Sequence, residues 1–455
     1  MFAFYDLETT GTSPAFDQPL QFAAILTDDD LNQVESVDIR CRLAPHILPA
    51  PWALAVTGVS PDQLMDPALP SWFEFSHQIS DLIKRWAPAT WTGYNTLAFD
   101  EEFLRQSFYQ NLHSNLYQTQ FDNNDRLDLM KVIYAVRERV PDALEWPIDD
   151  LGRESFKLDR LAPSNGFANH DAHDALGDVE ATIHMASLIR KRAPAVWDQC
   201  LLNRDKHQVD RLLKSGHPVR LIERFGAAPP RSYFGAYAGT NPQNRNSVAF
   251  LDLDLCDASI IDANDQDLAK AVAASPKRIR TIAINKVPNV FPVASPSASH
   301  SSLAQLVSAH PEFHKRVGQA LANRYADKEP AQYVEQLIYD EFYSAGDKQV
   351  LEEFTAADWR DRARIVTQLD DIRLKQLGMR LIFSNAPEFA SMNYRSAASV
   401  AIRDRWLTSE PSTPWTTKAT VEEQLHEIVS GEVLDQDRIC ALQDFYHARI
   451  SEIDA

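Results

Sequence analysis

Two carboxylates lie one residue apart near the start of the chain, at Asp6 and Glu8. Because side chains alternate faces along a strand, they are expected to share one face with Phe2 and Phe4. Two carboxylates beside aromatic rings repel each other and lose hydration, so a cation has to compensate them. Hard divalent ions prefer carboxylate oxygens. The pair indicates a metal site, although an acidic turn in which Thr10-Gly11 ends the strand would also account for it.

Two further carboxylates stand where helices are expected to begin. Asp100 precedes an amphipathic segment, where it could belong to the metal site or simply cap the helix by accepting hydrogen bonds from free N–H groups. Asp178 lies near the start of a helix expected over residues 174–192, in line with the apolar residues Met185 and Ile189. A carboxylate on an apolar face is costly unless it is paired or bound to a metal. Asp178 is therefore a third candidate ligand.

A histidine close to Asp178 could take up a proton. His173 precedes Asp178 by five positions, and His170 precedes it by eight. Imidazole titrates near neutrality, which suits a general base. A surface histidine in a polar loop is the alternative, and the residues alone leave both histidines open.

The composition is that of a globular protein of two or three domains. The chain has 455 residues, of which 44% are hydrophobic and 24% charged. Its net charge of −19 argues against indiscriminate nucleic-acid binding, because such a surface repels phosphate at long range. Residues 201–231 oppose this charge: seven Lys and Arg against three Asp and Glu give a local net of +4. The segment predicts a focused basic groove or, alternatively, a solvated helix face.

The sequence carries no sign of export or of membrane insertion. The N-terminus lacks the basic and apolar regions of a signal peptide, and no stretch approaches the roughly 18 apolar residues of a membrane helix. The four cysteines lie far apart, without a C-x-x-C pair, and are expected to be reduced thiols: Cys41, Cys200, Cys256 and Cys440. We therefore expect a cytoplasmic protein without a membrane partner.

Three regions are expected along the chain. The first alternates strands with helices, which predicts an α/β domain with strands over residues 2–7, 21–27 and 91–95 and helices over 73–86 and 174–192. After Ala193-Pro194, the pattern predicts a basic helical stretch over 196–214, strands over 247–255 and 278–285, and a surface loop over 292–302. Beyond about residue 330 the pattern is helical, and it ends in an amphipathic stretch over 420–453.

The order of the candidate residues resembles the DEDDh exonuclease superfamily. Four carboxylates and a histidine occur as D-x-E, D and H-x4-D, each at the end of an expected strand or helix. In that superfamily, three motifs bring four acidic residues around two metal ions on a ribonuclease-H-like sheet. The H-x4-D spacing selects His173 over His170.

The resemblance implies a phosphodiesterase mechanism and assigns its residues. Asp6, Glu8 and Asp178 would bind two Mg²⁺ ions, for which Mn²⁺ could substitute. Asp100 would complete the site, partly through water, and His173 would be the general base for the attacking water. Nucleoside 5′-monophosphates would leave one at a time from a 3′ end.

Further motifs are similar to those of the bacterial exonuclease I family, clearly over residues 1–345 and loosely over the helical tail. Besides the opening D-x-E-T-T-G, they are Gly93-Tyr94-Asn95, Ser155-Phe156-Lys157-Leu158, Asn203-Arg204-Asp205-Lys206-His207, Phe234-Gly235-Ala236, Asn244-Arg245-Asn246 and Ile284-Asn285-Lys286. The resemblance implies a ribonuclease-H-like exonuclease domain over 1–192, an SH3-like DNA-binding domain over 193–345 and a helical C-terminal domain over 346–455. Together they would enclose a single strand of DNA and exclude a duplex.

The same resemblance implies the substrate contacts and a protein partner. Candidate DNA contacts are Glu8, Thr9, Arg105, Lys157, Lys206, Asn246 and Lys286. At Lys157 the family often has Arg, so the charge is kept but the bidentate geometry is lost. The acidic tail of single-stranded DNA-binding protein would dock on basic residues such as Arg137. We expect a monomeric enzyme of DNA repair and recombination.

Two alternatives remain. An exoribonuclease of the same superfamily would end near Arg192, whereas this chain continues through two more regions. A non-catalytic scaffold that only binds single strands, or single-stranded DNA-binding protein, would be expected to have lost an acidic motif, and none is lost here.

Overall fold

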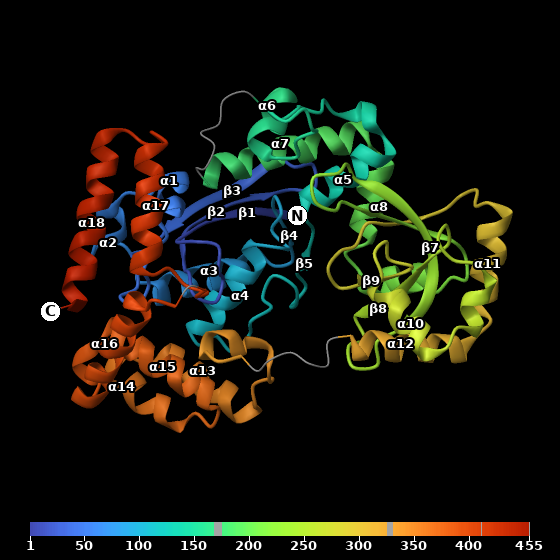
Figure 1. Cartoon of the computed structure of the whole chain (residues 1–455). Helices are drawn as coiled ribbons and strands as arrows, with labels where there is room; N and C mark the ends of the chain where they lie inside the picture. Colours follow the sequence, from blue (N-terminus) through green and yellow to red (C-terminus); the bar gives the residue numbers. More distant parts are fainter. Residues whose placement is uncertain (168–174, 325–330, 411, 455) are drawn as a thin grey trace.

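The computed structural model describes residues 1–167, 175–324, 331–410 and 412–454. It contains a five-stranded sheet with helices on both faces, a second five-stranded sheet to one side, and a group of helices on the other side (Figure 1). The predicted succession of an α/β region, a β-rich region and a helical region is confirmed. No helix within these ranges is both long enough and apolar enough to span a bilayer.

The first sheet has the strand order β3-β2-β1-β4-β5. Its strands are β1 (Phe2–Thr9), β2 (Pro19–Thr27), β3 (Gln33–Arg40), β4 (Thr90–Thr92) and β5 (Asp125–Arg126). β1 pairs antiparallel with β2 and parallel with β4, so it is the central strand. This mixed sheet has the predicted ribonuclease-H-like form, and it places the D-x-E motif in the interior of the domain.

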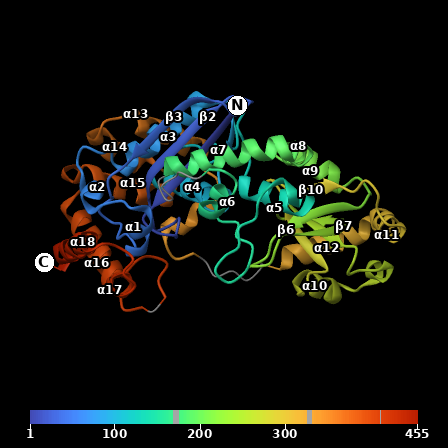
Figure 2. The ribbon, with the colours of Figure 1, turned by 90° about the horizontal axis from the view of Figure 1, so that it is seen from above.

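Helices cover both faces of this sheet, and alternate residues of β1 point into two cores. On one face, α7 (Ala175–Arg192) packs on β1 and β2 and on α5 (Leu129–Arg139) (Figure 2). On the other face lie α3 (Trp72–Trp86) and α4 (Asp100–Gln110) (Figure 1). Phe2 and Phe4 join the core beneath α7, whereas Tyr5 and Leu7 join the core beneath α3 and α4.

The second sheet is antiparallel throughout, in the order β10-β6-β7-β8-β9. Its strands are β6 (Val219–Glu223), β7 (Arg231–Thr240), β8 (Ser247–Asp252), β9 (Ile279–Ala283) and β10 (Val290–Pro292). Three helices cover it, namely α10 (Asp265–Ala273), α11 (Ala298–Ser308) and α12 (Pro311–Asn323). Gly318 allows α12 to approach β7, because a Cβ there would lie 2.4 Å from the Thr240 carbonyl oxygen. This is the expected SH3-like domain.

The helical end of the chain packs back onto the first domain. Its α-helices are α13 (Ala345–Ala356), α14 (Trp359–Ile365), α15 (Ile372–Asn385), α16 (Met392–Leu407), α17 (Lys418–Ser430) and α18 (Gln436–Asp454). α17 contacts α1 (Pro51–Thr57), and α18 contacts α2 (Pro61–Met65). Phe354 and Tyr446 belong to the same buried cluster as Phe75 of α3 and Phe103 of α4. The first and last regions therefore share one hydrophobic core.

Two long helical stretches expected from the sequence are each broken in the structure. Residues 196–214 form α8 (Pro194–Leu202) and α9 (Lys206–Leu213), because the Asp205 carboxylate accepts a hydrogen bond from the His207 N–H at 2.8 Å and starts a new helix. Residues 420–453 belong to α17 and α18, which are separated at Gly431. Both breaks fall at residues that commonly cap helices.

Two other segments also differ from expectation. The strand expected over residues 91–95 stops at Thr92, where the chain turns close against β1. This close approach requires glycine at position 93, because a Cβ there would lie 2.3 Å from the Tyr5 carbonyl oxygen. The surface loop expected over 292–302 contains the start of α11, where the Ser297 hydroxyl accepts a hydrogen bond from the His300 N–H at 3.1 Å. The signal for that cap, a serine before a helical pattern, was present in the sequence.

Candidate active site and nucleic-acid interface

Three carboxylates from two elements converge at the end of β1. Ligand oxygens of Asp6, Glu8 and Asp178 all lie within 4.8 Å of one another. Asp6 and Glu8 come from β1, and Asp178 comes from the first turn of α7. A set made only of carboxylate oxygens at this spacing fits Mg²⁺ or Mn²⁺ better than a softer metal.

The packing of α7 explains why Asp178 faces the D-x-E motif. One face of this helix is fully buried, in the same core as Phe2 and Phe4 of β1, and it includes Ala181, Met185 and Ile189. Asp178 continues that stripe by one turn toward the helix start and so meets the carboxylates at the end of the same face of the strand. The N-terminal end of a helix also favours negative charge.

Asp100 lies behind the cluster and is linked to it by the backbone. Its side chain is 3% exposed, and its Oδ1 accepts a hydrogen bond from the Leu7 N–H at 3.1 Å, between Asp6 and Glu8. Asp100 is the first residue of α4, whose N-cap position is occupied by Phe99. Burial raises the pKa of Asp100 to about 8, with smaller contributions from nearby carboxylates.

The electrostatics of the cluster call for positive charge. Burial first, and then Asp100, Glu8 and Asp178, raise the pKa of Asp6 well above its ordinary value. Four carboxylates, of which Glu8 and Asp100 are buried and Asp6 and Asp178 half-buried, therefore act on one another. Either protons or a cation must offset this repulsion, and divalent ions held by Asp6, Glu8 and Asp178 would do so at neutral pH.

The sequence reasoning missed another buried carboxylate, Asp128, at the N-cap of α5. It is 1% exposed and accepts hydrogen bonds from the N–H groups of Asn95, Leu97 and Met130 at 3.1, 3.2 and 3.0 Å. These bonds fix the turn of the Gly-Tyr-Asn motif, in which Asn95 has a φ of 65°. The only signal for Asp128 was its position before a helical segment, which is the position of an ordinary cap.

A second missed carboxylate holds the loop that follows the D-x-E motif. Asp17 is 5% exposed and accepts hydrogen bonds from the Thr10 hydroxyl and the Ser13 N–H, both at 2.9 Å. A Cβ at Gly11 would lie 2.4 Å from the Asp17 carboxylate, so glycine is needed for this approach. Thr9, a predicted DNA contact, is buried here, and its hydroxyl donates a hydrogen bond to the Gly11 carbonyl oxygen at 2.7 Å.

A groove of about 530 Å³ reaches Asp178 and contains one of the predicted DNA contacts, Lys157. Aromatic side chains, those of Tyr94, Tyr134 and Phe156, also line it. Exposed cations and aromatic rings beside a carboxylate cluster are what a single strand of nucleic acid requires near a reacting phosphate.

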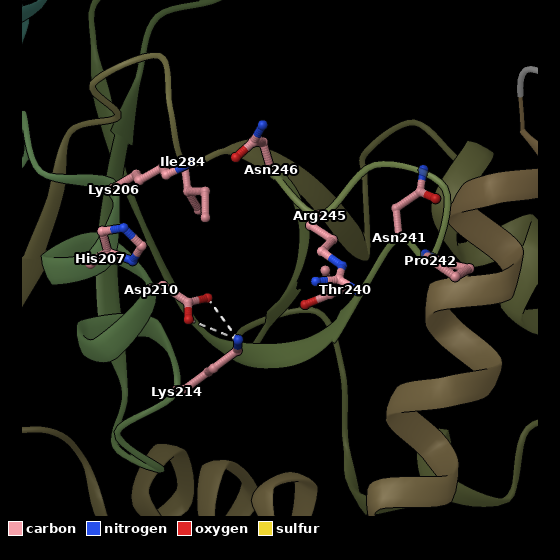
Figure 3. A pocket seen from close by; sticks show the side chains of 10 residues that line it. All are labelled: Lys206, His207, Asp210, Lys214, Thr240, Asn241, Pro242, Arg245, Asn246 and Ile284. Atoms are coloured by element: carbon pink, nitrogen blue, oxygen red, sulfur yellow. Dashed lines mark hydrogen bonds and ion pairs between the residues drawn. The ribbon is translucent and has the colours of Figure 1, made fainter. Parts of the chain in front are cut away.

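A second hollow, of about 670 Å³, lies on the SH3-like domain and holds two more of the predicted contacts, Lys206 and Asn246 (Figure 3). Arg245 and Lys214 also point into it (Figure 3). Lys214 forms an ion pair with Asp210 at 2.8 Å. The basic segment of residues 201–231 therefore contributes two lysines to one concave surface.

Three predicted residues lie in other surroundings. Arg105 is 6% exposed and forms ion pairs with Glu101 at 3.0 Å and Glu102 at 3.2 Å. Lys286 lies 3.6 Å from Glu102, at the contact between the SH3-like domain and α4. Arg137, the predicted docking residue for a protein partner, forms an ion pair with Glu154 at 2.6 Å. Their roles toward DNA or a partner stay predictions.

The predicted general base lies outside the described residues. His173 and its rival His170 both fall in the segment 168–174. The structure describes α7 from Ala175 onward, and Asp178 lies five residues after His173, so the choice between the two histidines still rests on the H-x4-D spacing.

The chain is similar to known exonucleases in both sequence and structure. Residues 3–186 match the exonuclease family model. Exodeoxyribonuclease I of Escherichia coli is 29% identical over 447 residues, which cover 89% of this chain and 88% of the relative. The structure of Escherichia coli exonuclease I with a dT13 oligonucleotide superposes with a TM-score of 0.84 at 25% identity, over 99% of both chains.

The chain is a relative of bacterial exonuclease I. The likeness extends over the nuclease domain, the SH3-like domain and the helical end alike, since the superposition covers almost the whole of both chains. A structure of exonuclease I with SSB and an inhibitor matches equally widely, with a TM-score of 0.83 at 26% identity over 99% of both chains. A small exonuclease of the superfamily would account only for the first of these three regions.

Proposed function

We propose that this exonuclease I relative degrades single-stranded DNA from its 3′ end to nucleoside 5′-monophosphates. The observation that carries the proposal is the convergence of Asp6, Glu8 and Asp178 within 4.8 Å, at the head of a groove lined by cations and aromatic rings. The relatedness to exodeoxyribonuclease I supplies the substrate class and the direction.

In this proposal, the carboxylates hold two Mg²⁺ ions, for which Mn²⁺ can substitute. Bound there, the ions would lower the pKa of the attacking water and stabilise the departing 3′ oxygen. Asp100 fixes the backbone between the two β1 ligands through Leu7 and completes the negative charge of the site. His173 is assigned the role of base that removes the proton from the water, by the spacing of its motif.

We assign the strand a path along both concave surfaces. Near the cluster it would contact Glu8, Thr9 and Lys157, and on the SH3-like domain Lys206 and Asn246. Aromatic rings tolerate any base, whereas lysines bind phosphate without reading sequence. Arg105 and Lys286 are assigned a place on this path only by family resemblance, and the ion pairs that both form with Glu102 would have to open for direct contact.

We also propose an interaction with the acidic tail of single-stranded DNA-binding protein. An acidic peptide could dock at Arg137 if it displaced Glu154, which now occupies that guanidinium. The proposed setting is DNA repair and recombination, with the enzyme acting in the cytoplasm as a monomer. The domain limits at residues 192 and 345 remain part of the proposal.

Digestion of three labelled substrates side by side tests the function: single-stranded DNA, duplex DNA and RNA, each with Mg²⁺ and with chelator. We expect Mg²⁺-dependent release of 5′-mononucleotides from single-stranded DNA, with duplex DNA and RNA largely resistant. Faster digestion of RNA would favour the exoribonuclease alternative. Binding without any cleavage would favour the scaffold.

A further inference from the structure

The groove that reaches Asp178 is built from two domains. The nuclease domain contributes Tyr94, Tyr134, Phe156 and Lys157. The SH3-like domain contributes Arg224, which directly follows β6. β6 packs against α5 of the nuclease domain, so the residue after it is held against the nuclease surface.

The guanidinium of Arg224 is oriented by rings of the nuclease domain. Its central carbon lies 4.6 Å from the ring centre of Phe156 and 5.6 Å from that of Tyr134. Its Nε donates a hydrogen bond to the Ala228 carbonyl oxygen at 3.1 Å, and Nη1 lies 3.5 Å from the Tyr134 hydroxyl. A stacked guanidinium loses less freedom on binding a ligand than a mobile side chain would.

The other arginines near this groove already have carboxylate partners. Arg153 pairs with Asp149 at 2.9 Å, and Arg137 pairs with Glu154 at 2.6 Å. Over the described ranges, by contrast, no carboxylate forms an ion pair with Arg224. Its charge is thus available to an anion that enters the groove, and a guanidinium matches a phosphate in a bidentate manner.

We propose that Arg224 binds a backbone phosphate of the DNA strand close to the metal site, so that the SH3-like domain takes part directly in presenting the 3′ end. This inference rests on the proposed function. Arg224 is a substrate-binding residue, and it would hold the ground state and the transition state equally. Its loss should therefore raise KM and leave kcat unchanged.

The test compares Arg224→Gln with Arg220→Gln. Arg220 lies on β6, and its guanidinium is also stacked on a ring, 5.1 Å from the centre of Phe234, but it does not line the groove. Binding of labelled oligothymidylates of four and of twelve nucleotides is measured in chelator over a range of salt. Arg224→Gln should weaken binding by about 10- to 100-fold and flatten the log–log salt slope by about 0.7 for both lengths, whereas Arg220→Gln should change neither.

An Arg224→Lys variant adds a second readout. A phosphate contact predicts that lysine restores the salt slope while part of the affinity stays lost, because the charge returns without the bidentate geometry. If Arg224→Gln fails to fold, as judged by circular dichroism, the lysine variant still tests the inference through its KM. A wild-type KM in both variants, together with a wild-type salt slope in Arg224→Gln, would overturn it.

The wild-type protein separates this inference from the function on which it rests. If the wild type releases mononucleotides from single-stranded DNA and Arg224→Gln binds like it at every salt concentration, only the Arg224 inference fails. If the wild type neither binds nor cuts single-stranded DNA, the proposed function fails and the inference fails with it.

Discussion

The carboxylate cluster and the hollow of the SH3-like domain would handle the same charged polymer under opposite conditions. The cluster is acidic and partly shielded from water, since Glu8 is buried and Asp6 and Asp178 are half-buried, and burial raises the pKa of Asp6 well above its ordinary value. The hollow is basic and open, and even its paired residues Lys214 and Asp210 are 43% and 31% exposed in their side chains. Charges act strongly where water is scarce and are screened where it is plentiful. Turnover and salt-dependent affinity should therefore be separable by mutation.

Removing a ligand from the cluster gives the largest expected effect. Asp6→Ala or Asp178→Ala should abolish hydrolysis, because the remaining carboxylates cannot hold the metal ions in place. Binding of single-stranded DNA in chelator should stay near wild type. Glu180→Gln is the matched control, since Glu180 lies on the exposed face of α7, two residues after Asp178. Wild-type turnover by either alanine variant would contradict the assignment.

The second largest effect is expected from replacing the predicted general base, His173. His173→Ala should lower the single-turnover rate by roughly two to four orders of magnitude, the usual contribution of general acid–base catalysis. His170→Ala should change the rate little, and it serves as the control from the same segment. Rapid-quench measurement with saturating enzyme isolates the chemical step. Greater sensitivity at His170 would show that the H-x4-D register is wrong.

Local periodicity predicted which face of its own strand or helix each metal-ligand candidate occupies. The two-residue period of β1 puts Asp6 and Glu8 on one face with Phe2 and Phe4, and the helical period puts Asp178 in line with the buried face of α7. The sequence does not say which strand and helix pack together, and the family resemblance supplied that step. The alternation of strands and helices likewise predicted an α/β domain, whereas the ribonuclease-H-like and SH3-like folds were implied by the family resemblance.

What the residues alone left undecided or overlooked depends on contacts between distant segments. Asp100 binds the Leu7 N–H across 93 residues, and nothing local to Asp100 distinguishes that role from a helix cap. Asp128 was not predicted, because a carboxylate just before a helix is commonly an ordinary cap. For Arg105 the signal was present: Glu101 and Glu102 precede it by four and three residues, the spacing of ion pairs on a helix. That spacing indicates a paired arginine.

A buried carboxylate next to β1, that of Asp17, allows the effect of burial to be tested through the pH dependence of stability. Burial raises the pKa of Asp17 to about 6, although hydrogen bonds from Ser13 and Thr10 oppose the shift. The folded state therefore binds this proton more tightly than the unfolded state, whose carboxyl has a pKa near 4. The contribution of this group to the free energy of unfolding is complete below pH 4. It falls by roughly 2–3 kcal/mol as the pH rises to about 6.

Asp17→Asn removes this titration. The free energy of unfolding of the variant minus that of the wild type should rise between about pH 4 and pH 6 and then level off, as measured by urea unfolding. Asp81→Asn, at an exposed position of α3, is the control and should show no such rise. A difference that stays constant with pH would mean that Asp17 is as well solvated as a surface carboxyl.

The smallest effect is expected from mutations in the open hollow of the SH3-like domain. Replacing Lys206 and Lys214 by Gln together should flatten the slope of log affinity against log salt by about 1.4, because each contact with a single strand contributes about 0.7. The chemical step on bound strands should hardly change, since neither residue belongs to the metal cluster. Processivity should fall, because the strand would be released more often between cuts.

The ion pair between Lys214 and Asp210 makes this last prediction sharper. If the ion pair between Asp210 and Lys214 persists when DNA binds, only Lys206 releases counterions. The double variant should then flatten the slope of log affinity against log salt by about 0.7 instead. Asp210→Asn then decides between the two outcomes, because it frees Lys214 and should steepen the slope by a similar amount. All titrations are done in chelator so that no strand is cut. A slope that is unchanged in every variant would mean that the hollow is a solvated surface and that binding depends on the groove at Asp178.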